Sequence, residues 1–308
     1  FSTQTIPEGW IWQDIGNYYG AGAVGLNWNE NQYDLYLEPG DQVGDPARIL
    51  RSVPEGPSAK LISELRTGPK GSGDRAYIFL GPYAETGFVR GTIPLGEHGF
   101  RISGSLPVPA IPFLNELRQA CVDSGIGVGG GIRSFSDAAG SALTEAPFFS
   151  WVSPPMDSVV YWFNRKSVNL YGEALIKTIA LLSKGWGSTD TGLAVMRRFW
   201  QEKQIDPDAL NLYDGSGLSP MNRITTQAQV MALLFARSRD WFPQFLASLP
   251  VYNGMTMKSG TISGVKGFCG YHTSRNGRTR AFSLLVNNYS GRTASLVEKM
   301  YRLLDELK

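Results

Sequence analysis

The stretch "VKGFCGYHTSRNGRTRAFSLLVNNYS", residues 265–290, decides the fold class of the second half of the chain. Apolar and polar side chains alternate on both sides of Asn276-Gly277, a dipeptide that suits the positive φ angles of a tight hairpin turn. The preceding stretch "MTMKSG", residues 255–260, has the same two-residue period. We therefore predict a run of antiparallel strands from residue 255 onward.

Helical periods surround these strands. Apolar residues recur every three or four positions in residues 113–125, 156–165, 167–185, 189–203, 225–238 and 294–308. In the third of these stretches they form one stripe of Tyr171, Leu175, Ile179 and Leu182. In the last stretch the residues expected to face inward are Leu296, Met300, Leu303 or Leu304, and Leu307. Helices followed by antiparallel strands and a terminal helix indicate an α+β domain with helices packed on a sheet.

The first part of the chain has a different pattern. Between residues 23 and 112, short β-like runs alternate with Gly- and Pro-rich turns, and only "PSAKLISELRTG", residues 57–68, reads as a helix. The three prolines of "PVPAIPF", residues 107–113, favour an extended linker. We predict two domains, a β-rich domain over residues 1–112 and the α+β domain over residues 113–308.

Composition excludes several classes of function. A formal net charge of +2 over 308 residues gives no electrostatic footprint for nucleic acid, and no apolar run approaches the ~18 residues of a transmembrane segment. Cys121 and Cys269 are too few for a disulfide framework or a Cys-rich zinc site. His98 and His272, the only histidines, stand in turn-like contexts and are interpreted as structural. We therefore expect neither a metal nor a cofactor.

Three polar motifs stand out. Ser167 and Asn169 directly precede a predicted helix, where ordinary helix capping by the Ser hydroxyl is the simpler interpretation. "MKSGTISG", residues 257–264, ends a strand, and its Gly260 allows a ligand to run close to the backbone. "YDGSGLSPMNRIT", residues 213–225, has a core rich in Gly and Ser in front of another helix. The Lys-Ser-Gly of residues 258–260 is weak evidence alone, whereas the third motif is far less expected by chance, and the three together carry the argument.

In this order and spacing, the motifs resemble those of the class C low-molecular-mass penicillin-binding proteins, which are penicillin-recognising serine D-Ala-D-Ala carboxypeptidases. "SVN" at 167–169 stands where this group has Ser-Asp-Asn, and "KSG" at 258–260 stands where it has Lys-Thr-Gly. The family's "DGSGLS" is intact at 214–219, and residues 9–22 and 100–107 are similar to its inserted domain. The resemblance implies a penicillin-binding-protein/β-lactamase-like transpeptidase domain of α+β class, plus a β-rich inserted domain.

The resemblance also implies roles for the motif residues. Ser167 would belong to the proton-transfer network, and Asn169 would hold the amide of the substrate. Lys258 would supply positive charge and help to deliver a proton to the departing D-Ala. The hydroxyl of Ser259 would bind the terminal carboxylate of the substrate, and the backbone N–H of Thr261 would form half of an oxyanion hole.

A further candidate lies in the first domain. "GWIWQDI", residues 9–15, places Asp14 where relatives have an Asp that helps to bind the stem-peptide side chain, and Tyr19 corresponds to a nearby aromatic residue. A solvated or turn-capping Asp is the alternative interpretation. Pro220 stands where an Arg usually follows the family's "DGSGLS", so the details of side-chain recognition do not carry over.

The family's Ser-x-x-Lys motif, which supplies the nucleophile and its activating lysine, is expected upstream of the inserted domain, before Phe1. The only match in the chain is Ser263-Gly-Val-Lys266, where Gly264 and a strand-like context argue against a helix start. We therefore expect a fragment or processed chain that is incomplete at the N-terminus of its transpeptidase-like domain and inactive alone. An N-terminal companion fragment stays open as a partner.

The resemblance implies a serine D-Ala-D-Ala carboxypeptidase that acts on peptidoglycan stem peptides through an acyl-enzyme, with β-lactams as inhibitors. It leaves endopeptidase activity open, and it implies export to the periplasm although this chain carries no export signal. A non-catalytic peptidoglycan-binding homologue is the main alternative. A β-lactamase is disfavoured, because such enzymes are generally single compact domains whereas this chain has a large β-rich insert.

Overall fold

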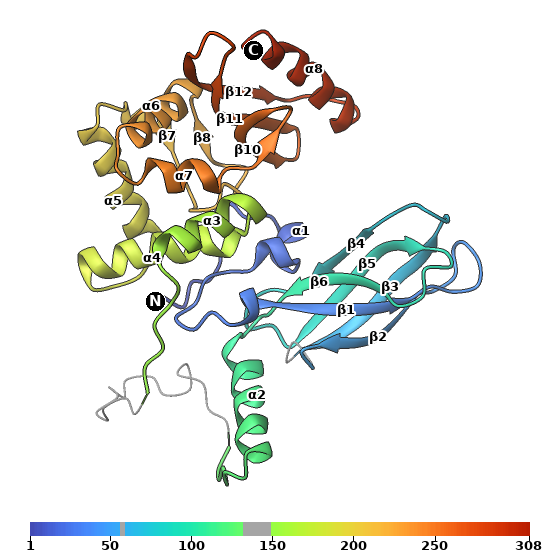
Figure 1. The fold of residues 1–308 in the computed structure, drawn as a ribbon. Coiled ribbons are helices and arrows are strands. Elements are labelled where there is room, and N and C mark those ends of the chain that lie inside the picture. The colour runs from blue at the N-terminus through green and yellow to red at the C-terminus, as the bar shows by residue number, and fades with distance from the viewer. Residues whose placement is uncertain (56–58, 132–148) are drawn as a thin grey trace. The chain divides into compact units, whose positions relative to one another are not determined.

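The computed structural model describes residues 1–55, 59–131 and 149–308. By its internal contacts the chain divides into two compact units, Phe1–Val152 and Ser153–Lys308 (Figure 1). Residues 57 and 58 of the helix predicted at 57–68 lie outside the described residues. The division falls just after residues 132–148, which also lie outside them, so the domain boundary at residue 112 stays a prediction.

Two three-stranded sheets form the first unit (Figure 1). One has the order β2-β1-β6 with antiparallel neighbours. The other has the order β3-β5-β4, in which β3 is parallel and β4 is antiparallel to β5. The bounds are β1 Gln32–Glu38, β2 Arg48–Val53, β3 Lys60–Gly68, β4 Arg75–Phe79, β5 Thr86–Pro94 and β6 Phe100–Ser105. Strands of both sheets contribute to one apolar core, with Leu35 and Ile102 from the first sheet and Leu65 and Val89 from the second.

The helix predicted over residues 57–68 is wrong, because residues 60–68 form strand β3. Leu61 and Leu65 have a helical spacing of four, but a strand also places them on one side, together with Thr67. Leu65 and Thr67 are buried, and β3 pairs with β5 over its whole length. Pairing with a neighbouring strand therefore outweighs the local spacing.

The extended linker predicted at 107–113 also differs from the structure. Helix α2, Ala110–Asp123, begins inside this segment and contains Pro112 in its first turn. Proline is tolerated there because the first N–H groups of a helix have no partner within the helix. Three short helical elements precede β1, namely α1 Trp12–Ile15, η1 Tyr18–Gly20 and η2 Asn29–Asn31.

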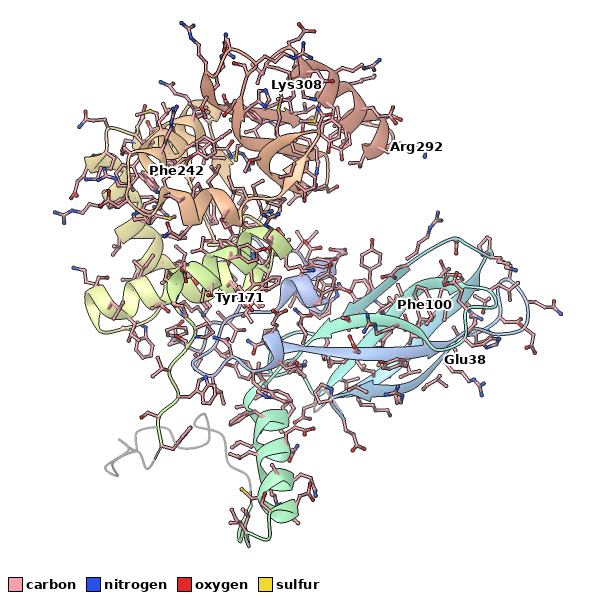
Figure 2. All side chains as sticks on the ribbon, viewed as in Figure 1. Glu38, Phe100, Tyr171, Phe242, Arg292 and Lys308 are labelled. Carbon is pink, nitrogen blue, oxygen red and sulfur yellow. The ribbon has the colours of Figure 1, made fainter. Side chains whose placement is uncertain are left out.

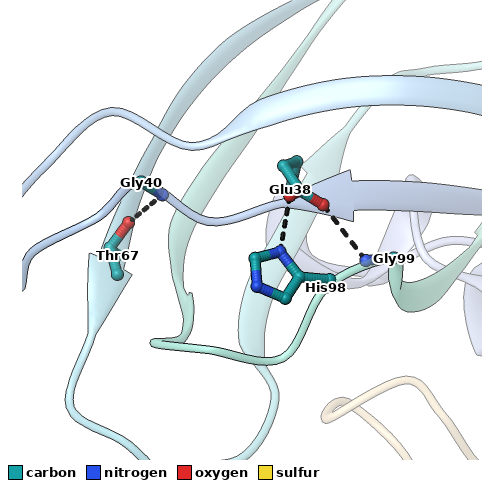
Figure 3. A network of polar contacts seen from close by, with 5 residues as sticks. All are labelled: Glu38, Gly40, Thr67, His98 and Gly99. Carbon is teal, nitrogen blue, oxygen red and sulfur yellow. Dashed lines mark hydrogen bonds and ion pairs between the residues drawn. The ribbon is translucent and has the colours of Figure 1, made fainter.

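Polar contacts join strand ends in the first unit (Figure 3). Glu38, the last residue of β1, has its Oε1 2.6 Å from Nδ1 of His98, and its Oε2 accepts a 3.2 Å hydrogen bond from the N–H of Gly99. The hydrogen bond with His98 is the main cause that lowers the pKa of Glu38. Close by, the N–H of Gly40 donates to Oγ1 of Thr67 at 2.8 Å. His98 therefore tethers a loop to a strand, in keeping with its structural interpretation.

A four-stranded antiparallel sheet forms the centre of the second unit, in the order β12-β11-β10-β9. The bounds are β9 Val251–Tyr252, β10 Met255–Ile262, β11 Val265–Thr273 and β12 Thr279–Asn287. Gly277, in the turn between β11 and β12, has the predicted positive φ, 77°, whereas Asn276 does not, so the Asn-Gly dipeptide has only one of its two expected positive φ angles. The run of antiparallel strands predicted from residue 255 is confirmed.

Helix α8, Thr293–Asp305, covers one face of this sheet. Its Met300 and Leu304 belong to the same core cluster as Met257 and Phe268 of the strands. Leu303 is 59% exposed, so Leu304 is the member of that pair that faces inward. Because side chains alternate between the two faces of a strand, Met257 and Phe268 mark the face of β10 and β11 that α8 covers.

Helices α6, Thr226–Arg237, and α7, Phe242–Ser248, cover the opposite face. Figure 2 labels Phe242, the first residue of α7. Its ring centroid lies 5.2 Å from that of Tyr271 in β11, in an edge-to-face arrangement. Leu233 of α6 is buried in one apolar cluster with Tyr271 and Leu249. Helices packed on both faces of an antiparallel sheet confirm the α+β class predicted for this part of the chain.

The remaining elements of the second unit are α3 Met156–Lys166, α4 Asn169–Lys184, α5 Thr189–Glu202, η4 Pro207–Ala209, β7 Leu210–Asn211 and β8 Arg223–Ile224. In α4 the predicted stripe is not the buried face, because Leu182 is 82% exposed. The buried positions instead include Leu170 and Ala180 together with the charged residues Glu173 and Lys177. Among the described residues, none of the helices combines the length and apolar composition that a membrane span requires.

Candidate active site

Ser167 occupies the tight junction between two helices. Helix α3 ends at Lys166 and α4 begins at Asn169, and Ser167 between them has φ 56° and ψ 44°, the left-handed conformation. A non-glycine residue rarely adopts this conformation, which costs about 1–2 kcal/mol. The N-cap of α4 is Val168, and no side chain caps that helix end. The helix-capping interpretation of Ser167 is therefore wrong, and its exposed hydroxyl is available for another partner.

That partner is Lys258 in β10. The Nζ of Lys258 donates a 2.9 Å hydrogen bond to Oγ of Ser167 and a 2.7 Å hydrogen bond to the carbonyl oxygen of Ser259. A lysine ammonium has only donors, so the Ser167 oxygen must be the acceptor. The proton of Ser167 can then be donated to a further group. The two sequence motifs thus converge on one hydrogen bond.

The surroundings of Lys258 are electrostatically unusual. Burial lowers the pKa of Lys258, the thiol of Cys269 opposes this effect, and the positive charge of Lys266 adds to it. Cys269 stands directly across from Lys258 in the β10–β11 register, and burial raises the pKa of its thiol. Within residues 1–55, 59–131 and 149–308, no carboxylate forms an ion pair with Lys258 or Lys266. The site is therefore positively charged and suits an anionic ligand.

The edge of β10 beyond Lys258 is open. Strand β9 pairs only with Met255 and Thr256, and in the described part of the chain no other strand pairs with this edge of β10. Gly260 is exposed, and a Cβ built on it would meet no atom within 4 Å. Ser259 is half-buried and Thr261 is exposed. An extended ligand can therefore approach the backbone here and pair with it as an added strand.

The "DGSGLS" segment at 214–219 is a compact turn built around Asp214. One carboxylate oxygen of Asp214 accepts hydrogen bonds from the N–H of Gly217 at 2.7 Å and from Nδ2 of Asn222 at 2.8 Å. The other accepts a 2.6 Å hydrogen bond from the N–H of Ser219. Charge-assisted bonds of this kind hold the turn in one conformation.

Helix α4 is anchored on this turn. Oε1 of Glu173 accepts hydrogen bonds from the N–H groups of Gly215 at 3.0 Å and Ser216 at 2.9 Å. The backbones also approach closely, since a Cβ on Gly172 would lie 2.6 Å from the carbonyl oxygen of Gly215. Asn169 is the first residue of α4, one helical turn before Glu173. The turn therefore supports the end of α4 that presents Asn169 and adjoins Ser167.

Sequence reasoning missed Glu173 and Lys177. Both side chains are fully buried, burial and the charge of Asp214 raise the pKa of Glu173, and burial lowers the pKa of Lys177. The only sequence signal of this pair was an acidic and a basic residue four positions apart in a helix, a spacing that normally marks an ion pair exposed to solvent. Contact with a distant turn explains Glu173, and no local pattern reveals such a contact.

Asp14 lies in the first unit, in the short helix α1. Burial raises its pKa, whereas a hydrogen bond with the side chain of Tyr19 lowers it. Burial is also the main cause that raises the pKa of Tyr19. Asp14 and Tyr19, which the sequence suggested as neighbours, are thus in contact. The placement of Asp14 relative to Ser167 stays a prediction.

The match to Ser-x-x-Lys at 263–266 has no helical context. Ser263 and Gly264 form the two-residue turn between β10 and β11, and Gly264 has a φ of 71°. Lys266 therefore lies at the start of a strand, across from Thr261. Among the described residues, no group of three or more His, Cys, Asp or Glu side chains could hold a metal ion.

Comparison with known proteins identifies a family. The profile of the D-Ala-D-Ala carboxypeptidase 3 (S13) family matches residues 1–306. The D-alanyl-D-alanine carboxypeptidase of an Actinomadura species is 26% identical in an alignment that covers 94% of this chain and 58% of that protein. The penicillin-sensitive carboxypeptidase A of Dictyostelium discoideum is 25% identical, over 84% of this chain and 49% of that protein. The chain thus spans between about half and three fifths of these relatives.

Solved structures show the same fold. Penicillin binding protein 4 (dacB) from Haemophilus influenzae superimposes with a TM-score of 0.77 at 18% identity, covering 100% of this chain and 72% of that chain. The same protein complexed with a β-lactam gives a TM-score of 0.70 at 17% identity, covering 92% and 70% of the two chains. The fold that the motifs predicted is confirmed.

Proposed function

The chain belongs to the D-Ala-D-Ala carboxypeptidase 3 (S13) family, and on this premise we propose that the whole protein removes the terminal D-Ala from peptidoglycan stem peptides as a serine-type peptidase. The observation that carries the proposal is the hydrogen bond from Lys258 to Ser167. It joins a proton donor to a hydroxyl that can pass a proton onward, beside a strand edge that can hold a peptide.

The proposed reaction proceeds through an acyl-enzyme. A nucleophilic serine attacks the carbonyl carbon of the penultimate D-Ala, the C–N bond to the last D-Ala breaks, and water later hydrolyses the ester. Ser167 donates its proton to the departing nitrogen and recovers one from Lys258. The lowered pKa of Lys258 makes that transfer easier, because the buried ammonium releases its proton more readily. The proton lost by the nucleophile restores Lys258.

Substrate binding uses the same edge of β10. Asn169 holds the amide of the substrate, and the hydroxyl of Ser259 donates to the terminal carboxylate. Gly260 leaves room for the peptide, and the backbone N–H of Thr261 stabilises the oxyanion. In enzymes of this kind such a donor contributes about 3 kcal/mol. The positive charge of the site supports binding of a carboxylate rather than of a neutral chain end.

Asp14 binds a cationic group on the stem-peptide side chain in this proposal, and replacing Asp14 with Asn should then raise KM for a peptide carrying that cation. Cleavage of cross-links belongs to the same chemistry, because a cross-link also ends in a D-Ala amide bond. The protein acts in the periplasm, and a separate N-terminal segment can associate with this chain to supply the nucleophile.

The proposal is tested by labelling the full-length protein with a fluorescent penicillin and by measuring release of D-Ala from a stem peptide. We expect a stable adduct on a serine that is followed three residues later by a lysine in a helix. An adduct on Ser263, or none, contradicts the proposal, and the latter favours a non-catalytic peptidoglycan-binding protein. Rapid turnover of penicillin indicates a β-lactamase instead.

A further inference from the structure

Lys266 holds the hydroxyl of Thr261 at the edge of the candidate site. Its Nζ donates a 2.6 Å hydrogen bond to Oγ1 of Thr261, which is its register partner across the β10–β11 hairpin. Lys266 is only 8% exposed, and its Nζ lies 4.9 Å from the ring centroid of Phe268. An aromatic face and a strand thus fix a buried cation beside an exposed hydroxyl.

The charge of Lys266 lacks a negative partner in the described part of the chain. Buried ammonium groups are normally paired with acids, because burying an unpaired charge is costly. Burial alone lowers the pKa of Lys266, and its charge also acts on Lys258. Two cations without an acid therefore lie near the same strand edge, where an arriving anion would be stabilised.

The contact also fixes the direction of the Thr261 hydroxyl. A hydroxyl has one proton to donate, and an ammonium can only donate, so Thr261 accepts from Lys266 and must offer its own proton elsewhere. Thr261 and Ser259 are two residues apart on β10 and share one face of the strand. The hydroxyls of Ser259 and Thr261 thus flank the exposed Gly260 on the open edge.

We propose that Lys266 is a positioning residue for the C-terminal carboxylate of the ligand, acting by holding the Thr261 hydroxyl as an outward-pointing donor and by adding positive charge. The inference rests on the proposed function for the identity of the peptide. It adds a determinant, outside the three motifs, of selectivity for a free carboxylate over an amidated chain end.

The test compares the binding of N-acetyl-D-Ala-D-Ala and of its C-terminal amide to the full-length protein by ligand-detected NMR. We expect the wild type to bind the acid at least about tenfold more tightly than the amide. Lys266→Met keeps the aliphatic packing on Phe268 and should reduce this preference below about threefold, whereas Lys266→Arg should retain most of it. Thermal melts check that each variant is folded.

A second pair of variants separates positioning from general charge. Thr261 is exposed, so Thr261→Val should fold, and it should lose the acid preference as Lys266→Met does, while Thr261→Ser keeps it. If Lys266 acts through Thr261, the double variant loses no more than Lys266→Met alone. An unchanged acid-to-amide ratio in Lys266→Met, no preference in the wild type, or fully additive losses overturn the inference. Penicillin labelling of the same proteins reports separately on the proposed function.

Discussion

The ammonium of Lys258 donates a 2.9 Å hydrogen bond to the hydroxyl oxygen of Ser167, although 91 positions separate the two residues in the chain. Ser167 comes from a left-handed junction between two helices, and Lys258 comes from a strand of the central sheet. The fold brings these elements together, and the direction of the hydrogen bond leaves the Ser167 proton available for transfer.

Activity should fall on the alkaline side at a pH below 10.5, the ordinary pKa of lysine, because burial lowers the pKa of Lys258. Protonated Lys258 is the proposed donor, so the active fraction decreases as the pH rises through the lowered pKa. Lys258→Arg keeps its charge throughout this range and should lack this limb, although its acylation is slower overall. The pH profile of penicillin acylation measures this difference, and an identical alkaline limb in Lys258→Arg would contradict the assignment.

Glu173 should be important for stability through its bonds to Gly215 and Ser216. Glu173→Ala leaves two backbone N–H groups without their acceptor and should lower the free energy of unfolding by roughly 2–6 kcal/mol, taking about 1–3 kcal/mol for each unsatisfied group. Glu173→Gln retains an acceptor oxygen and should cost less than about 1 kcal/mol. Denaturant unfolding of the two variants tests this, and equal losses would show that the acceptor is not what matters.

The contact between α4 and the "DGSGLS" turn should tolerate no added side chain. A Cβ on Gly215 would lie 2.4 Å from the carbonyl oxygen of Gly172, so Gly215→Ala should destabilise the protein by about 1–3 kcal/mol through overpacking. Gly260→Ala is the matched control, because its Cβ meets no atom within 4 Å. We expect Gly260→Ala to leave the melting temperature unchanged and to weaken ligand binding. A stable Gly215→Ala variant would argue against the close packing.

Helices α3 to α6, helix α8 and strands β10 to β12 could be predicted because each has a clear period and its own turn signals. Helix α7 and the two-residue strands β7, β8 and β9 were not predicted, because they are too short to show a period. Strand β3 could not be predicted, since the spacing of Leu61 and Leu65 fits a helix equally well and only pairing with β5 decides between them. Helix α2 begins at Ala110, although the prolines of residues 107–113 favoured an extended linker there. Pro112 lies in the first turn, where a proline does not interrupt the hydrogen bonds of a helix.

Some residues of the candidate site could likewise be predicted from the sequence, and others could not. Ser167, Lys258 and Ser259 could be found because they stand in motifs with a recognisable spacing. Glu173 and Lys266 could not, because each matters through a partner that is remote in sequence or across a hairpin. Lys266 in particular is the lysine of the match to Ser-x-x-Lys at 263–266, and the structure instead places its Nζ beside the hydroxyl of Thr261.

The central claim is that Ser167 and Lys258 act as one unit, and a double-mutant cycle on the acylation rate tests it most directly. Each single variant, Ser167→Ala and Lys258→Met, should slow penicillin acylation of the full-length protein by about 10²-fold or more, the range for loss of a positioned proton donor. The double variant should be slower by little more than the worse single variant, which is the signature of residues that share one function. If the two losses multiply, or if Ser167→Ala acylates at the wild-type rate, the hydrogen bond between them has no catalytic meaning.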